Sequence, residues 1–183
     1  VGYHPATSPL KVNSSSSDDL SDMGEGFVIV ELFTSQGCYS CPPADDNLRE
    51  ITADAAEQGI KVIPLAFHVD YWNYLGWKDI YSDKAYSTRQ RKYASSLSSG
   101  VYTPQMVFNG QAECVGSRRG ESKGLVETAL KQQPLANIRL EARKGESVYQ
   151  IEYDVKGNTN GKILHLALVE TGLEVDIARG ENG

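Results

Sequence analysis

Short apolar runs and helical repeats alternate along the middle of the chain. Residues 27–33, FVIVELF, and residues 60–69, IKVIPLAFHV, are almost continuously apolar, which is typical of strands covered on both faces of a sheet. Between them, residues 43–58 carry apolar side chains at helical spacing. We expect Pro64 at a bulge, or where no ladder hydrogen bond is needed. Strand, helix and strand in this order imply a parallel right-handed crossover.

The pattern then predicts an irregular aromatic segment, a helix, a hairpin and a last helix. Their ranges are 70–79, 80–97, 105–108 with 112–115, and 122–132. Asn109-Gly110 indicates the hairpin turn, because both residues tolerate positive φ. This order matches the thioredoxin arrangement. The predicted fold is therefore α/β, a thioredoxin-like three-layer fold in residues 26–134 with a helical insert at 70–100.

The two ends of the chain have a different character. Residues 1–25 include a stretch of Ser and Asp with almost nothing to bury, which indicates a flexible N-terminal arm. After Pro134, alternating apolar and polar runs are separated by KGES and GNTNG, as in an antiparallel meander. We interpret residues 135–183 as a C-terminal antiparallel β appendage.

Charge and hydropathy argue against two classes of partner. The chain of 183 residues has 18 Lys and Arg against 24 Asp and Glu, a formal charge of −6, and no basic run that could follow a phosphate backbone. Its longest apolar runs are far shorter than the roughly 20 residues of a membrane span. We therefore expect no nucleic acid partner and no membrane span.

The chemistry is concentrated in TSQGCYSCPPAD, residues 34–45, where the first strand meets the first helix. Cys38 and Cys41 have a spacing that lets their sulfurs reach bonding distance on a first helical turn. Unpaired N–H groups and the helix dipole would favour a thiolate on Cys38, the predicted nucleophile. Cys41 would then resolve a mixed disulfide. Tyr39 is expected to tune the thiolate.

A second signal is Thr103-Pro104. In thioredoxin-like folds a cis-proline opens the strand before the hairpin and lies beside the cysteine pair, and the preceding residue offers its backbone to an incoming chain. The resemblance implies these roles here, because only about 5–6% of X–Pro bonds in folded proteins are cis. The alternative is a trans proline at the start of an edge strand.

The segment FHVDYWNYLGWKD supplies further candidates. His68 and Asp70 follow the second strand, whose carboxyl end lies at the same edge of a parallel sheet as that of the first strand. Either side chain is a candidate acceptor for the proton of Cys41. The alternatives are a core histidine and a helix cap. Trp72 and its aromatic neighbours either line a partner groove or form local core.

Two non-catalytic uses of the cysteine pair remain open. A soft metal could bind Cys38, Cys41 and His68, but a zinc site normally has four ligands and no second cysteine pair completes it, so we assign no metal and no cofactor. A static disulfide is the other alternative, although so short a loop stabilises little. Cys114, the odd cysteine, is interpreted as a buried small hydrophobe.

Five segments together resemble a known family. They are ELFTSQGCYSCPPAD, HVDYWNYLGWKD, RQRKYA, YTPQMVFNG and RGEN. The chain is similar to the domain of unknown function 1223 family, thioredoxin-like proteins of bacteria that are mainly secreted or in the cell envelope. The resemblance implies a thioredoxin-like fold and an extracytoplasmic location, in the periplasm or cell envelope, and supplies no substrate.

These observations favour a thiol-disulfide oxidoreductase that acts on protein or small-molecule thiols and disulfides. The alternative is a non-catalytic binding module in which the cysteines form a structural disulfide or a soft-metal site. The sequence leaves the redox direction and the oligomeric state open.

Overall fold

The computed structural model describes residues 26–146 and 148–177. The predicted arm, residues 1–25, lies outside the described residues. Internal contacts divide the described chain into two compact units, one with residues 27–132 and 169–177 and the other with 133–168. The first unit carries the cysteine pair.

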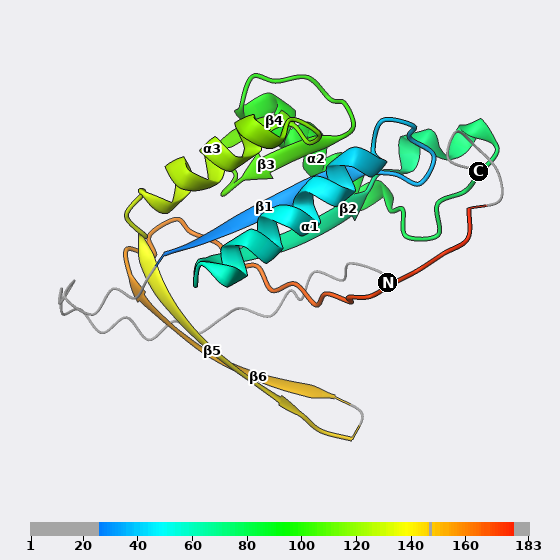
Figure 1. Ribbon diagram of the computed structural model, residues 1–183. Helices are drawn as coiled ribbons and strands as arrows, with labels where there is room; N and C mark the ends of the chain where they lie inside the picture. Colours follow the sequence, from blue (N-terminus) through cyan, green and yellow to red (C-terminus); the bar gives the residue numbers. More distant parts are fainter. Residues whose placement is uncertain (1–25, 147, 178–183) are drawn as a thin grey trace. The chain divides into compact units, whose positions relative to one another are not determined.

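A four-stranded mixed sheet forms the centre of the first unit, in the order β2-β1-β3-β4 (Figure 1). The strands are β1 (Phe27–Thr34), β2 (Lys61–His68), β3 (Gln105–Phe108) and β4 (Ala112–Val115). β1 pairs in parallel with β2 and antiparallel with β3, and β3 pairs antiparallel with β4. The predicted mixed α/β class is confirmed.

Pro64 fits this sheet without a bulge. It lies opposite Val30 in an unbroken register, and β2 is an edge strand. A proline on an edge strand costs no ladder hydrogen bond when its position faces away from the neighbouring strand. One of the two sequence-based expectations for this proline therefore applies, and the bulge does not.

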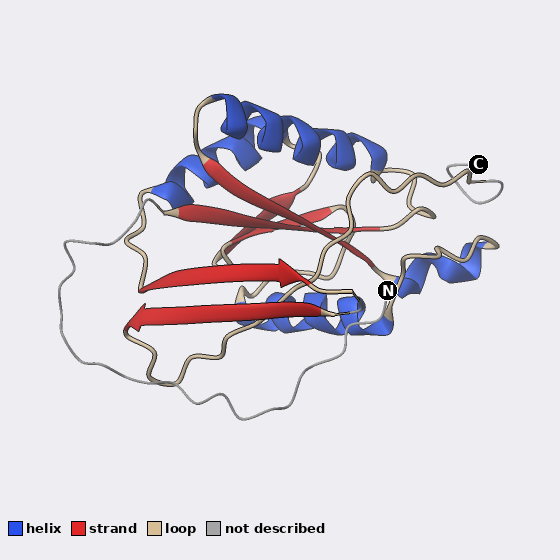
Figure 2. Ribbon diagram, turned by 90° about the horizontal axis from the view of Figure 1, so that it is seen from below, coloured by secondary structure: helices blue, strands red, loops and turns tan. Residues whose placement is uncertain are grey.

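Helices cover both faces of the sheet (Figures 1 and 2). α1 (Pro42–Glu57) and α3 (Arg119–Leu130) bury one face, because Val28, Val30 and Leu32 of β1 pack with them in one core cluster. α2 (Lys84–Ser96) covers the other face, where Phe33 packs with its side chains in a second cluster. Alternate residues of β1 thus serve two different cores.

Two details of the insert differ from the sequence prediction. Asp70–Leu75, expected to be irregular, forms a 3₁₀ helix, η2, that ends at Gly76 with a φ of 90°. α2 begins at Lys84, not at Ile80, because the side chain of Asp83 accepts a hydrogen bond from the backbone N–H of Ala85 and caps the helix. The local cap therefore overrides the apolar periodicity.

The hairpin turn forms where Asn109-Gly110 predicted it. Both residues have positive φ, 48° and 67°. The side-chain oxygen of Asn109 also accepts a hydrogen bond from the N–H of Ile29, at 2.8 Å. The turn therefore ties the hairpin to the beginning of β1.

The second unit contains one antiparallel hairpin, β5 (Ala136–Lys144) and β6 (Tyr149–Gly157). The register places Leu140 opposite Tyr153 on an apolar face, and Arg139 opposite Asp154 on a polar one. The third run of the predicted meander, residues 162–169, is not a strand.

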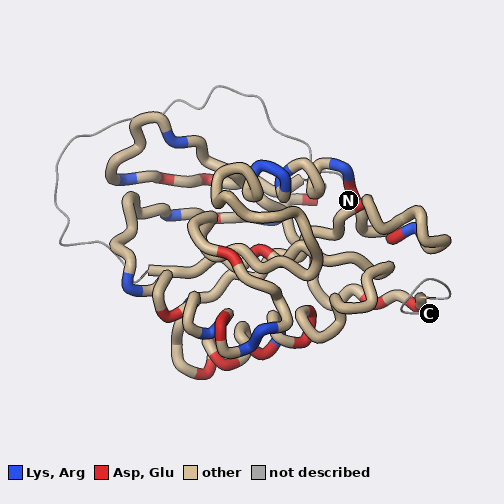
Figure 3. The backbone as a smooth tube through the Cα atoms, turned by 90° about the horizontal axis from the view of Figure 1, so that it is seen from above, with Lys and Arg blue, Asp and Glu red and all other residues tan. Residues whose placement is uncertain are grey.

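Lys and Arg lie among Asp and Glu along the described chain (Figure 3). Exposed ion pairs join Arg49 to Asp46, Lys123 to Asp54 and Arg139 to Glu141. Of the helices described, none has the length and apolar character needed to cross a membrane.

A buried carboxylate anchors α2 to the sheet. Glu31 of β1 is only 4% exposed, and both its oxygens accept hydrogen bonds from the guanidinium of Arg89, at 2.6 and 2.8 Å. The hydroxyl of Tyr93 donates to the same carboxylate at 2.6 Å. Burial and this carboxylate raise the pKa of Tyr93, which therefore stays protonated.

We predict that Arg89→Ala destabilises the protein by about 2–4 kcal/mol, because it leaves a buried carboxylate without its cation. Lys123→Ala, which breaks the exposed pair with Asp54, is the control and should leave the unfolding midpoint nearly unchanged. Urea unfolding of the two variants measures the difference. Equal midpoints would show that Glu31 does not depend on Arg89.

Candidate functional site

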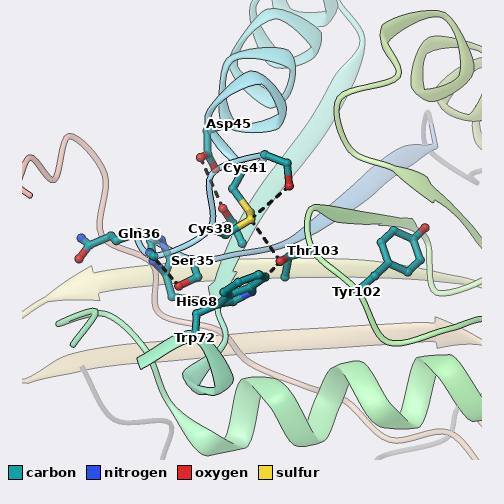
Figure 4. Close-up of a disulfide and its surroundings, with 12 residues drawn as sticks. Ser35, Gln36, Cys38, Cys41, Asp45, His68, Trp72, Tyr102 and Thr103 are labelled. Atoms are coloured by element: carbon teal, nitrogen blue, oxygen red, sulfur yellow. Dashed lines mark hydrogen bonds between the residues drawn. A yellow bond between two sulfur atoms is a disulfide. The ribbon is translucent and has the colours of Figure 1, made fainter. Parts of the chain in front are cut away.

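The cysteine pair lies in the loop between β1 and α1 (Figure 4). Cys38 and Cys41 form a disulfide with their Cα atoms 5.4 Å apart. Two successive turns build the loop, because the N–H of Cys38 donates to the carbonyl of Ser35 and the N–H of Cys41 donates to that of Cys38, both at 3.1 Å. The backbone thus holds the two sulfurs together.

The helix start differs from the sequence expectation. α1 begins at Pro42 with Cys41 as its N-cap, so Cys38 precedes the helix and does not lie on its first turn. Pro42 and Pro43 have no N–H. The next two N–H groups, of Ala44 and Asp45, both donate to the carbonyl of Cys41, at 2.8 and 3.1 Å. None of these first four helix residues therefore gives an N–H to Cys38.

A hydroxyl approaches Cys38 instead. Thr103 lies just before β3, and its peptide bond to Pro104 is cis. Its Oγ1 donates to Sγ of Cys38 at 3.2 Å and lies 2.8 Å from Nε1 of Trp72, which donates to it. The hydroxyl of Ser40 lies 3.6 Å from the same sulfur. Three separate segments of the chain thus meet at Cys38 (Figure 4).

Trp72 also packs against the residue that precedes Cys38. A Cβ at Gly37 would lie 3.4 Å from Cβ of Trp72 and 3.5 Å from its carbonyl oxygen. A larger side chain there would have to extend past this contact. The insert, through Trp72, therefore borders the residue that precedes Cys38.

His68 lies at the predicted edge but binds a carboxylate. β1 and β2 end together, with Thr34 opposite His68. Nδ1 of His68 lies 2.7 Å from Oδ2 of Asp79, whose side chain is fully buried. The same oxygen accepts the N–H of Gln36 at 2.8 Å. Asp79 therefore joins the histidine to the loop that leads to Cys38.

Asp79 is held as an anion. Burial opposes ionisation, but the hydrogen bond and the positive charge of His68, with the N–H groups of Gln36 and Tyr81, outweigh it and lower the pKa of Asp79. The side chain of Gln36 is fixed as well as its backbone, because its Oε1 accepts a hydrogen bond from the indole N–H of Trp77 at 2.8 Å. This cluster fixes the backbone next to the cysteines.

Asp45 lies one turn along α1 from Cys41, and its carboxylate accepts a hydrogen bond from the Thr34 hydroxyl at 3.4 Å (Figure 4). Burial raises the pKa of its carboxyl to about 6, against the weaker opposing effects of the Thr34 hydroxyl and the charge of His68. A carboxyl with this pKa exchanges protons near neutral pH.

The remaining predicted residues are placed as follows. Asp70 is the first residue of η2, and the Ser87 hydroxyl donates to its carboxylate and accepts its backbone N–H. The N-cap of η2 is Val69, so the expected capping role of Asp70 is not seen. Tyr39 is 75% exposed next to Cys38. Both disulfide sulfurs belong to fully buried residues, with 0% exposure for Cys38 and Cys41.

Cys114 lies apart from this site, in β4, and belongs to the core cluster under α1 and α3. It is 3% exposed, and burial, reinforced by Glu121 and Glu113, raises the pKa of its thiol to about 12. Such a thiol is unreactive at neutral pH. In the described part of the chain, no group of three or more His, Cys, Asp and Glu side chains could hold a metal ion.

The sequence analysis missed Asp45, Asp79 and Gln36. Asp45 follows Cys41 by four residues, so helical spacing alone could have placed it beside the cysteine. Asp79 had no comparable signal, because its contact with His68 and Gln36 depends on how the insert folds back over the sheet edge.

The comparisons with known proteins identify the family. Residues 29–183 match the family described as "Protein of unknown function (DUF1223)". The chain belongs to the DUF1223 family. This confirms the resemblance drawn from the sequence.

One solved structure is also similar to this chain. The X-ray crystal structure of a structural genomics target from Agrobacterium tumefaciens is similar to this chain, with 39% identity and a TM-score of 0.56. The match covers 68% of this chain and 54% of the Agrobacterium chain. Among curated proteins, none matches the sequence.

We predict that Asp45→Asn makes the oxidised protein more stable at pH 7.5, by about 1–3 kcal/mol. The pKa of Asp45 is raised from 3.8 to about 6 in the folded protein, so folding binds a proton in this window. The wild type should therefore lose stability as pH rises from about 4 to 6, and the variant should lack that loss. Denaturant unfolding of the wild type and of Asp45→Asn at pH 4 and at pH 7.5 measures this change in the free energy of unfolding.

The control is Asp46→Asn on the exposed side of the same turn, which removes one charge without removing the buried carboxyl. An equal loss of stability between pH 4 and 7.5 in Asp45→Asn and in the wild type would contradict the assignment.

Proposed function

We propose that this DUF1223 protein is a thiol-disulfide oxidoreductase with a thioredoxin-like core. The strand, helix, strand, insert, hairpin and helix of the first unit follow the order expected for that fold. The observation that carries the proposal is the contact of Thr103, next to a cis-proline, with the sulfur of a Cys-x-x-Cys disulfide. The partners we propose are protein or small-molecule thiols and disulfides.

The reaction uses both cysteines in turn. In the reduced protein the thiolate of Cys38 attacks a substrate disulfide, forms a mixed disulfide and releases one substrate sulfur. The sulfur of Cys41 then attacks Sγ of Cys38, the mixed disulfide breaks, and the second substrate sulfur leaves. Two electrons pass from the protein to the substrate, and the reverse sequence oxidises a substrate dithiol.

Asp45 is our candidate for the proton transfer. Cys41 must lose its proton before it attacks, and a carboxylate whose pKa is about 6 can take that proton near neutral pH. This assigns to Asp45 the role that the sequence suggested for His68 or Asp70. His68, bound to Asp79, has a positioning role in this proposal.

An extracytoplasmic location, in the periplasm or cell envelope, is part of the proposal. It is supported by membership of the DUF1223 family, through the resemblance described above. A disulfide in the protein is compatible with such an oxidising compartment.

One observation favours a second candidate, a binding module with a static disulfide. Both cysteines are completely buried, whereas exchange needs access to a sulfur. Catalysis therefore requires the groups around Cys38 to move when substrate arrives. Reducibility separates the two candidates, because a static buried bridge resists reductant while a redox centre exchanges readily.

We predict that Cys38→Ser abolishes disulfide exchange with a model dithiol peptide, since it removes the attacking sulfur. Cys41→Ser, incubated with the disulfide form of the same peptide, should accumulate a mixed disulfide at Cys38, because the Cys38 thiolate displaces one peptide sulfur and the resolving sulfur is absent. Gel shift after thiol alkylation and mass spectrometry measure both outcomes.

Cys114→Ser is the matched control, because it removes the cysteine that lies outside the site and should leave exchange unchanged. Full activity in Cys38→Ser, or a wild-type disulfide that resists a large excess of dithiothreitol, would favour the static bridge.

A further inference from the structure

We propose that Trp72 and Thr103 form a directed hydrogen-bond relay that stabilises the Cys38 thiolate, and that this makes the protein a disulfide donor. In this direction it oxidises substrate thiols. The inference rests on the proposed function and specifies its direction.

The relay has a fixed polarity. An indole N–H can only donate, so the 2.8 Å contact makes Oγ1 of Thr103 the acceptor of the Trp72 proton. The hydroxyl hydrogen of Thr103 is thereby free to point at Sγ of Cys38, 3.2 Å away. Trp72 thus orients Thr103 as a donor toward the sulfur.

The oxygen of Tyr71 is a second possible acceptor for the hydroxyl hydrogen of Thr103. The hydroxyl of Tyr71 is within hydrogen-bonding reach of Thr103, and it donates its own proton to Gln90 at 3.1 Å. A neutral phenol oxygen is a weaker acceptor than a sulfur anion. The hydrogen of Thr103 therefore turns to Cys38 when that sulfur becomes a thiolate.

The beginning of α1 supplies no N–H to Cys38, which raises the importance of the Thr103 hydroxyl. Pro42 and Pro43 supply no N–H, and the next two N–H groups of α1 bind the carbonyl of Cys41. Cys38 is fully buried, so a thiolate there loses water and needs hydrogen bonds from the protein. Ser40 lies further away, at 3.6 Å, and is exposed to competing water.

Stabilising the thiolate favours the reduced protein, so the disulfide becomes a stronger oxidant. A substrate thiolate attacks Sγ of Cys38, the bond to Cys41 breaks, and the sulfur of Cys41 takes up a proton. A second substrate thiolate then attacks the substrate sulfur of the mixed disulfide and releases the Cys38 thiolate. The substrate loses two electrons, and the protein is reoxidised by a disulfide compound of higher potential.

The test is equilibration of the purified chain with glutathione buffers, followed by alkylation to count reduced protein. We expect the wild type to be more oxidising than glutathione. Thr103→Val, similar in size but without the hydroxyl, should shift the equilibrium constant about tenfold toward the disulfide, which corresponds to about 30 mV. It should also lower the thiolate absorbance of the reduced protein at neutral pH.

Three variants complete the design. Thr103→Ser keeps the hydroxyl and should stay within about twofold of the wild type, and Ser40→Ala should change the constant less than about threefold. Trp72→Phe keeps Thr103 but removes the orienting N–H, so the shift should be in the direction of Thr103→Val and smaller. If Thr103→Val fails to fold, the equilibrium constant of Trp72→Phe with glutathione tests the relay.

An unchanged equilibrium constant in Thr103→Val and Trp72→Phe would overturn the relay, and a wild type more reducing than glutathione would overturn the disulfide-donor direction. If Cys38-dependent exchange persists in those samples, the proposed oxidoreductase function survives. Loss of the proposed function would be seen separately, as a wild type that does not exchange at all.

Discussion

The pairing of β1 with both β2 and β3 determines which side chains can reach Cys38. β1 runs parallel to β2, so the Cys38 loop and His68 leave the sheet at the same edge. β3 runs antiparallel to β1, so the residues just before β3 arrive at that edge too. Thr103 lies two residues before β3. The direction of that strand therefore brings the Thr103 hydroxyl toward Sγ of Cys38.

Complete burial makes the chemistry of this site depend on a small number of hydrogen bonds. A buried sulfur anion loses the solvation of water, and a single well-directed donor then has a larger effect than it would at an exposed site. The helix dipole of α1 still favours negative charge at its start, but Pro42 and Pro43 remove two of the donors that normally accompany it. Asp45 opposes the anion when it is ionised. The hydroxyl of Thr103 is one donor that favours the anion, and this is why its orientation by Trp72 matters.

The sequence was sufficient to predict the parts of the fold that depend on local patterns. Continuous apolar runs located β1 and β2, and Asn109-Gly110 located the hairpin turn, because these signals are properties of neighbouring residues. The cysteine spacing likewise predicted a bond between Cys38 and Cys41. The family was recognised from long ordered motifs.

The sequence could not reveal contacts that depend on the folded insert. Asp79 binds His68 and the backbone of Gln36 from eleven and forty-three residues away, and no periodicity links these positions. The predicted position of Cys38 on the first turn of α1 was also wrong. A Cys-x-x-Cys motif followed by two prolines does not show whether the first cysteine lies inside the helix. Only the fold shows that Cys38 precedes it.

The insert therefore acts as part of the site and not as a separate appendage of the sheet. Trp72 orients Thr103 and borders Gly37, Trp77 holds the side chain of Gln36, and Asp79 holds its backbone. All three come from a single stretch of eight residues, 72–79. A displacement of this stretch would release the Cys38 loop and the Thr103 donor together, because the same backbone carries both contacts. The Cys38 loop and the Thr103 hydroxyl are consequently held by one segment of the insert.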